Sequence, residues 1–285
     1  MKLTIVGSGS PEAYGRRASS GYLLEVATDR LLFDCGGGVF DNLLRAGYAP
    51  KDITHLFFTH YHSDHMMDYP RLLHAAWDEA GTTPKVFGPP PLRSITEGYF
   101  GKNGVLAHDL RARTELEASQ QVWVARGGAL PRPWPSPVLT EIAPGFSHAE
   151  NGWRLRAAEA THAQPFLQCL GFALEWGGKK FVYSGDTGIN AEITALCKNA
   201  DLLVHWCYRG SEEQEQGGGL SLRALCPDPR AIAEMAVSAG VKYLVLSHFR
   251  THMDRPKNYA ASRKALRETF GPNSTIAEDL DIFHI

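Results

Sequence analysis

The sequence predicts an α/β fold: a four-layer αββα sandwich in which two mixed β-sheets lie face to face and helices cover their outer sides. Two observations support this prediction. Apolar runs of strand length alternate with stretches of helical spacing, and a series of strands followed by helices occurs twice along the chain. The 285 residues, 44% of them hydrophobic, fit one large domain with a sizeable core, and we expect a single domain over 1–285.

The first third of the chain contains apolar, β-compatible runs that end at Gly, Asp or His, together with two stretches of helical spacing. The second helical stretch has Pro70 in its first turn and stops at Gly81, as helices commonly do. The elements expected here are strands over 2–7, 21–27, 30–36 and 54–60, and helices over 39–48 and 65–81.

The middle stretch, 82–152, carries nine of the seventeen prolines. Apolar and aromatic residues recur throughout it, so we expect a partly helical insertion that packs over the domain, with a helix over 110–126. Its aromatic side chains either form apolar walls of a substrate cleft or pack in the core: Tyr99, Phe100, Trp123 and Trp134.

The final third returns to alternating elements of the two kinds. The elements expected are strands over 153–160, 170–176, 179–184, 201–205 and 242–247, and helices over 189–198, 228–239 and 257–270. A glycine-rich polar stretch, 209–223, is expected to form a loop.

The charge balance disfavours a polyanion as the main partner. The chain has 29 Lys and Arg against 31 Asp and Glu, a formal net charge of −2, so no bulk positive field gathers nucleic acid. Five dispersed cysteines without a C-x-x-C pair indicate a reducing compartment. No run approaches the ~20 apolar residues of a membrane span. We therefore expect a cytoplasmic protein with no membrane association.

A cluster of ligating residues follows the strand expected over 54–60. His60, His62, Asp64 and His65 form the pattern H-x-H-x-D-H. In an extended chain residues i and i+2 point the same way, so His60 and His62 can share one metal ion. The turn into the next helix would swing the other two toward a second ion. Imidazole and carboxylate ligands suit zinc, manganese or iron, whereas the alternative is a surface loop with accidental histidines.

Three later strands each end in one polar group that can complete a pair of metal sites. These groups are His162, Asp186 and His248. Taken singly, each is an ordinary strand-end residue or turn. Taken together with the H-x-H-x-D-H pattern, they predict a centre with two metal ions.

The stretches IVGSGSPE, LLFDCGGG, FFTHYHSDH, ATH, YSGDT and VLSHF resemble the metallo-β-lactamase superfamily of metal-dependent hydrolases. The resemblance implies two divalent ions, with zinc expected and manganese or iron as alternatives. It also implies that Asp34 steadies a ligand histidine. The implied ligands are His60, His62 and His162 for the first ion, Asp64, His65 and His248 for the second, and Asp186 as a bridge.

Within this superfamily the chain is similar to ribonuclease Z and to the metal-dependent arylsulfatase. Three features depart from ribonuclease Z. Trp206 replaces the Glu of its H-E-A-T signature, LCPDPRA stands where its His-Ser-Thr stretch opens a helix, and only 24 positions separate His162 from Asp186, too few for its tRNA-gripping arm. With the charge balance, these departures favour a small-molecule substrate, and nucleic acid is not expected. The alternative is a ribonuclease Z-like phosphodiesterase that acts on tRNA precursors.

The mechanism expected is hydrolysis by a metal-bridged hydroxide, which cleaves an ester-type bond in a sulfate ester, phosphodiester, lactone or cyclic amide. Asp64 is expected both to hold metal and to accept a proton. His205 is the candidate for protonating the leaving group or hydrogen-bonding the developing oxyanion, although a buried structural role is the alternative. Tyr208 is expected close by. The sequence leaves the oligomeric state open, with a homodimer as one alternative.

Overall fold

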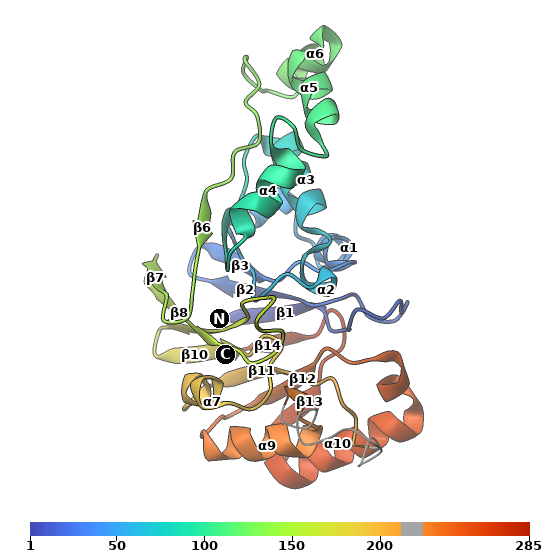
Figure 1. Cartoon of the computed structure of the whole chain (residues 1–285), viewed down its shortest axis with the longest axis vertical. Coiled ribbons are helices and arrows are strands. Elements are labelled where there is room, and N and C mark those ends of the chain that lie inside the picture. The colour runs from blue at the N-terminus through green and yellow to red at the C-terminus, as the bar shows by residue number, and fades with distance from the viewer. Residues whose placement is uncertain (212–224) are drawn as a thin grey trace.

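The computed structural model describes residues 1–211 and 225–285, so most of the loop expected over 209–223 lies outside the described residues. Two sheets lie face to face across the middle of the molecule, and helices cover both outer sides (Figure 1). The predicted αββα sandwich is confirmed.

Among the described residues each sheet has seven strands, with antiparallel pairs on one side and parallel pairs on the other. In spatial order the first sheet contains β14 (Ile282–His284), β1 (Lys2–Gly7), β2 (Gly21–Val26), β3 (Asp29–Phe33), β4 (His55–Phe57), β5 (Lys85–Gly88) and β6 (Leu139–Glu141). The second contains β13 (Ser274–Ile276), β12 (Leu244–Ser247), β11 (Leu202–Trp206), β10 (Lys179–Tyr183), β9 (Leu170–Trp176), β8 (Trp153–Glu159) and β7 (Ser147–Glu150).

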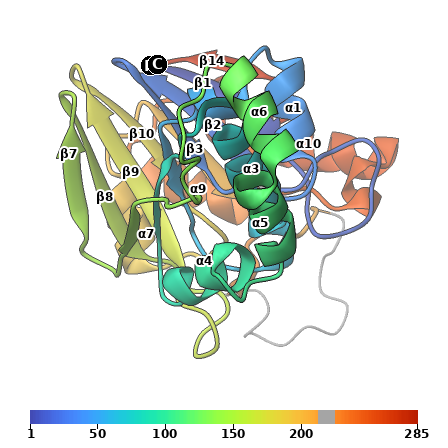
Figure 2. The same cartoon turned by 90° about the horizontal axis from the view of Figure 1, so that it is seen from above.

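The helices divide between the two outer faces, and α5 and α6 project beyond the first sheet (Figures 1 and 2). Side chains of Asn190 and Asp228 cap two of them by accepting a backbone N–H three residues on. The described helices are α1 (Val39–Arg45), α2 (Ser63–Met66), α3 (Tyr69–Ala80), α4 (Leu92–Phe100), α5 (Ala107–Glu115), α6 (Glu117–Ala125), α7 (Ala191–Cys197), α9 (Pro229–Ser238) and α10 (Pro256–Phe270). Two short 3₁₀ helices cover Pro50–Asp52 and Thr251–Asp254.

Apolar side chains form three layers of core, as four packed layers of secondary structure require. The central layer lies between the sheets and is rich in aromatic rings, with Phe33 contacting Phe57, Phe172 and Phe181 at centroid distances of 5.4–5.7 Å. The two outer layers hold α1 and α3 against the first sheet, and α7, α9 and α10 against the second.

Two expected helices are interrupted, and both breaks have a backbone cause. The helix expected over 65–81 is α2 followed by α3, because Cys35 donates its N–H to the His65 carbonyl and accepts from the Asp68 N–H. The helix expected over 110–126 is α5 followed by α6, because Leu116 between them is extended, with φ −72° and ψ 126°.

Three strands in the middle stretch were not expected from the sequence. β5, β6 and β7 have only three or four residues each, too few to give a visible alternation of apolar and polar positions. Both ends of 82–152 therefore contribute to the sheets, while α4, α5 and α6 lie between them. The single domain with an insertion over 82–152 stays a prediction.

Within 1–211 and 225–285, no helix combines the length and the apolar character that crossing a membrane requires.

Candidate metal centre

The seven side chains predicted to hold metal meet at one edge of the sandwich, where strands of both sheets end. They form three overlapping groups of side chains whose ligand atoms lie within 4.8 Å of one another. The seven are His60 and His62 after β4, Asp64 and His65 in α2, His162 after β8, Asp186 after β10 and His248 after β12.

The first group contains His60, His62 and His162. His62 Nδ1 lies 3.0 Å from His60 Nε2 and 3.2 Å from His162 Nε2. Two nitrogens bound to one tetrahedral zinc ion at 2.0–2.1 Å are about 3.3 Å apart, so these spacings fit a shared ion. His60 is fully buried, whereas His62 and His162 are half-buried, so the group faces solvent on one side.

The second group contains Asp64, His65 and His248, all of them buried. Asp64 Oδ2 lies 2.9 Å from His248 Nε2 and 3.4 Å from His65 Nε2. Two imidazoles and one carboxylate oxygen are a ligand set that divalent transition metals accept.

Asp186 stands between the two groups. Its Oδ1 lies 3.4 Å from His65 Nε2, while its Oδ2 lies 3.3 Å from His248 Nε2 and 3.7 Å from His162 Nε2. One carboxylate thus faces histidines of both groups, which is the arrangement that a bridging ligand needs.

Two buried atoms at the centre of the cluster support a cation there. Among the described residues, His65 Nε2 and Asp186 Oδ1 have no hydrogen-bond partner although both are removed from solvent. Leaving buried polar atoms unpaired costs free energy, and a metal ion between them would satisfy both. The residues present therefore fit a metal centre.

Asp34 fixes which ring nitrogens face the cluster. Its Oδ2 accepts from His65 Nδ1 at 2.8 Å and from the Thr59 hydroxyl at 2.9 Å. The Thr59 hydroxyl donates its only proton to Asp34, so it must accept from His60 Nδ1, which lies 3.0 Å away. Both histidines consequently turn Nε2 toward the metal position, where metal ligands need it.

The buried charges at the centre create a strongly negative site. Burial alone would raise the pKa of Asp64 and of Asp186, but the neighbouring histidines hold both well below the ordinary value, so both carboxyls stay ionised. Burial opposes a charge on His65, yet Asp186, Asp64 and Asp34 together raise its pKa well above the ordinary value. The same three carboxylates would attract a metal cation to this position.

Two residues of the site have left-handed backbone conformations, which are uncommon outside glycine. Asp34 has φ 58° and His248 has φ 71°. The backbone N–H groups of His248 and Phe249 both donate to the carbonyl of Ser8, at 2.8 and 3.0 Å. The loop that follows β1 therefore holds His248 in this conformation, and such strain is typical of functional sites.

His205 lies in β11 close to the cluster but in none of the three ligand groups. Side chains alternate along a strand, so His205 shares a face with Leu203, which packs in the outer core layer under α7 and α9. Its Nδ1 donates to the Trp206 carbonyl at 2.7 Å, and burial lowers its pKa to about 4. A catalytic role for His205 stays a prediction.

The neighbour of His205 is the residue that contacts the cluster. Trp206 points toward the other sheet, and its ring centroid lies 5.2 Å from that of His162 and 5.9 Å from that of His248. Tyr208 stacks on Trp206 at 5.7 Å, and the Arg250 guanidinium lies 4.3 Å from the centre of the Tyr208 ring. The pairing of β11 with β10 and β12 decides which side chain faces the centre, and no sequence pattern signals it.

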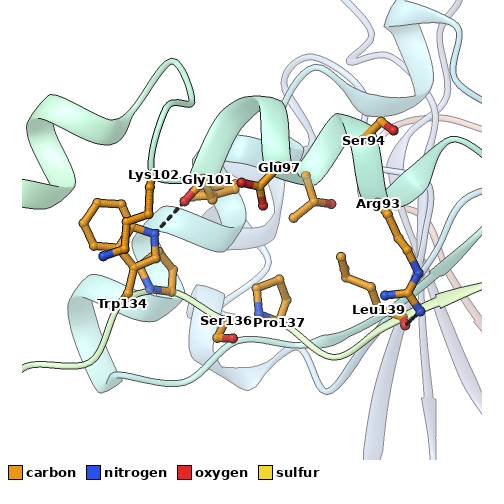
Figure 3. A pocket seen from close by; sticks show the side chains of 12 residues that line it. Arg93, Ser94, Glu97, Gly101, Lys102, Trp134, Ser136, Pro137 and Leu139 are labelled. Atoms are coloured by element: carbon orange, nitrogen blue, oxygen red, sulfur yellow. Dashed lines mark hydrogen bonds between the residues drawn. The ribbon is translucent and has the colours of Figure 1, made fainter.

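The aromatic residues of the middle stretch occupy other places. Phe100 and Trp134 line a pocket of about 690 Å³ between α4 and the segment 134–139, with Lys102 over the Trp134 ring (Figure 3). Trp123 packs against the Arg132 guanidinium at 4.5 Å. The predicted role of these rings in a substrate cleft stays a prediction.

The chain matches known proteins over most of its length. A family profile described as "Beta-lactamase superfamily domain" matches residues 29–249. Ribonuclease Z from Mycobacterium sp. (strain KMS) is 30% identical over 259 residues, which cover 87% of this chain and 84% of that protein. Ribonuclease Z from Methanothermobacter thermautotrophicus is 28% identical over 307 residues, covering 98% of this chain and 95% of that protein.

Solved structures share the fold. Human tRNase Z, short form, has a TM-score of 0.71 with 21% identity and covers 100% of this chain and 99% of its own. The metallo-beta-lactamase fold protein YhfI from Bacillus subtilis has a TM-score of 0.69 with 19% identity, and the match covers 99% of both chains.

Two expectations from the sequence are wrong against these comparisons: that the substrate is a small molecule, and that nucleic acid is not a partner. The curated relatives that match over most of their own length are named Ribonuclease Z. Contact with a nucleic acid needs only local charged and aromatic groups, whereas the formal net charge describes the whole surface. The net charge therefore did not predict whether the protein binds nucleic acid. The short spacing from His162 to Asp186 excludes only the tRNA-gripping arm of ribonuclease Z. It does not exclude contact between RNA and other parts of this protein.

Replacing Asp34 by Asn should weaken zinc binding by about 10- to 100-fold, because the amide can no longer accept all the hydrogen bonds that orient His60 and His65. Competition with a chromophoric chelator measures the affinity. Asp29→Asn is the matched control, since Asp29 is also buried but binds Trp153 and Asn151 away from the centre. Equal affinities in the Asp34→Asn variant and the wild type would contradict the orienting role.

Proposed function

Since the chain belongs to the beta-lactamase superfamily, whose members bind metal ions, we propose that it is a ribonuclease Z-like phosphodiesterase that acts on RNA, with tRNA precursors as the substrate class. The resemblance seen in the sequence is confirmed, and the chain is a metal-dependent hydrolase. The observation that carries the choice of substrate is the match to relatives named Ribonuclease Z over 84–95% of their length.

Two divalent ions are proposed, with zinc as the first choice because nitrogen and oxygen donors surround the site. His60, His62 and His162 would hold one ion, Asp64, His65 and His248 the other, and Asp186 would bridge them. When bound, such a pair of ions supplies Lewis acidity and a water activated for attack on phosphorus. A homodimer stays a prediction.

The protein's own groups would orient the reaction and move its protons. Asp64 keeps an ionised carboxylate beside His248 and can accept a proton as well as bind metal. Asp34 holds His60 and His65 in the tautomer that offers Nε2 to the centre. His205 is the proposed partner of the leaving group or of the developing negative charge.

A group of aromatic rings with one guanidinium beside the cluster fits an RNA substrate. Trp206, Tyr208 and Arg250 stack in series next to His248, with the Tyr208 ring between the buried Trp206 and the Arg250 guanidinium. Unstacked bases bind to guanidinium planes of this kind, and Arg250 ends the series. Phe166, four residues after His162, is 91% exposed and offers a further ring at the open side. These residues supply contacts that do not depend on a long arm between His162 and Asp186.

The metal-loaded protein should cleave precursor tRNA, and Asp186→Ala should abolish cleavage and lose the ions of the candidate metal centre, because the bridge between the two groups is lost. Product lengths on denaturing gels and metal content by elemental mass spectrometry are the measurements. Asp29→Asn is the control that should keep both properties. If protein that carries both ions of the candidate metal centre leaves precursor tRNA intact, the proposed substrate is wrong.

Replacing His205 by Ala should keep the wild-type metal content, since His205 belongs to none of the ligand groups. Its kcat should fall by about 10²-fold, the lower end of what a positioned proton donor or acceptor contributes. Single-turnover cleavage and metal analysis of the same sample separate the two effects. An unchanged kcat, or a loss of metal, would leave His205 with a structural role alone.

Removing the Tyr208 ring should raise KM for RNA, because the ring supports the Arg250 guanidinium at 4.3 Å, and stacking of a base at such a site is worth about 1–3 kcal/mol. Tyr208→Ala should show a rise of roughly tenfold with little change in kcat, while Tyr208→Phe, which keeps the ring, should behave as the wild type. Steady-state cleavage of precursor tRNA gives both constants. A rise in the Phe variant as large as in the Ala variant would show that the hydroxyl, not the ring, matters.

A further inference from the structure

A second cluster of ligating side chains lies at another place in the sandwich. His55 is the first residue of β4 in the first sheet, and His148 and Glu150 belong to β7 in the second. Glu150 Oε2 lies 3.1 Å from His55 Nε2 and 3.2 Å from His148 Nε2. The three ligand atoms all lie within 4.8 Å of one another.

This cluster is separate from the candidate metal centre. His55 begins the stretch that leads to His60, and five residues of extended chain span about 16 Å. The candidate metal centre lies beyond the carboxyl end of β4, whereas His55 lies at its amino end. An ion bound here would not contact the seven residues assigned above.

Packing holds the two imidazoles in place. His148 and Glu150 are two residues apart on β7, so both side chains project from the same face of the strand. The His55 and His148 rings each contact Phe87 and Trp153, at centroid distances of 5.2–6.2 Å. The ring nitrogens therefore converge on the Glu150 carboxylate without any need for movement.

Hydrogen bonds orient these groups toward one another. Lys85 Nζ lies 2.6 Å from Glu150 Oε1, which leaves Oε2 to the histidines. His55 Nδ1 lies 2.8 Å from the Thr54 hydroxyl, so Nε2 of the same ring faces the cluster.

We propose that His55, His148 and Glu150 bind a further divalent transition-metal ion of the zinc class, which links the two sheets. The spacings of 3.1 and 3.2 Å match the separation of about 3.3 Å between ligands of one tetrahedral zinc ion. Three protein ligands leave one position for water. The side chains of His148 and Glu150 are 28% and 25% exposed, so an ion can reach the site from solvent.

The test is metal stoichiometry in protein stripped with a chelator and reloaded with zinc. His148→Ala should bind one ion fewer per chain than the wild type, and His108→Ala, which removes an exposed histidine of α5, should bind the wild-type number. Because the comparison is a difference, it does not depend on how many ions the other centre holds. Equal stoichiometry in His148→Ala and the wild type would overturn the proposal and leave only imidazole–carboxylate hydrogen bonds.

A melting experiment gives an independent readout and covers the case in which one variant loses stability. Zinc at about 100 times its Kd should raise the Tm of Asp186→Ala by roughly 5 °C, since that variant keeps the ion linking β4 and β7. The rise should vanish when Glu150→Gln is added to Asp186→Ala. An unchanged rise in the double variant would overturn the proposal, whereas failure of RNA cleavage alone would not.

Discussion

The carboxylate of Asp34 is the group on which the geometry of the metal centre depends. It accepts hydrogen bonds from the backbone and hydroxyl of Thr59, from His65 Nδ1 and from the Tyr183 hydroxyl. These donors come from the end of β4, from α2 and from β10, so one buried anion joins both sheets. These hydrogen bonds also fix which ring nitrogen of the ligand histidines His60 and His65 faces the metal position. A charge this deep is stable because four hydrogen bonds surround it, one to Oδ1 and three to Oδ2.

The ligands come from both sheets, so the centre exists only when the two sheets are docked. The turn after β4 and helix α2 supply four of the seven side chains, and the ends of β8, β10 and β12 supply the others. Each of these positions lies at the carboxyl end of a strand, where loops are free to vary without disturbing the core. The candidate metal ligands thus lie at the edge of the sandwich, while apolar side chains fill its interior.

The sequence predicted the architecture and all seven candidate ligands because both leave local patterns. H-x-H-x-D-H is a run of six residues, and β8 to β12 lie in clear apolar runs. The short strands β5, β6 and β7 were not predicted, since three or four residues show at most two repeats of the two-residue strand period; β4 and β12 are as short but lie inside longer apolar runs. Which of His205 and Trp206 faces the centre depends on strand pairing. The cluster of His55 and His148 joins residues far apart in the chain, so spacing cannot indicate it.

The pairing of β14 with β1 affects the order in which the protein folds during synthesis. It follows all strands of the second sheet in the chain, yet it pairs with β1 at the edge of the first, with Lys2 opposite His284. During synthesis on the ribosome the edge of β1 therefore stays unpaired until residues 282–284 have emerged. Closure of so large a loop is slow, and an unpaired strand invites association with other nascent chains.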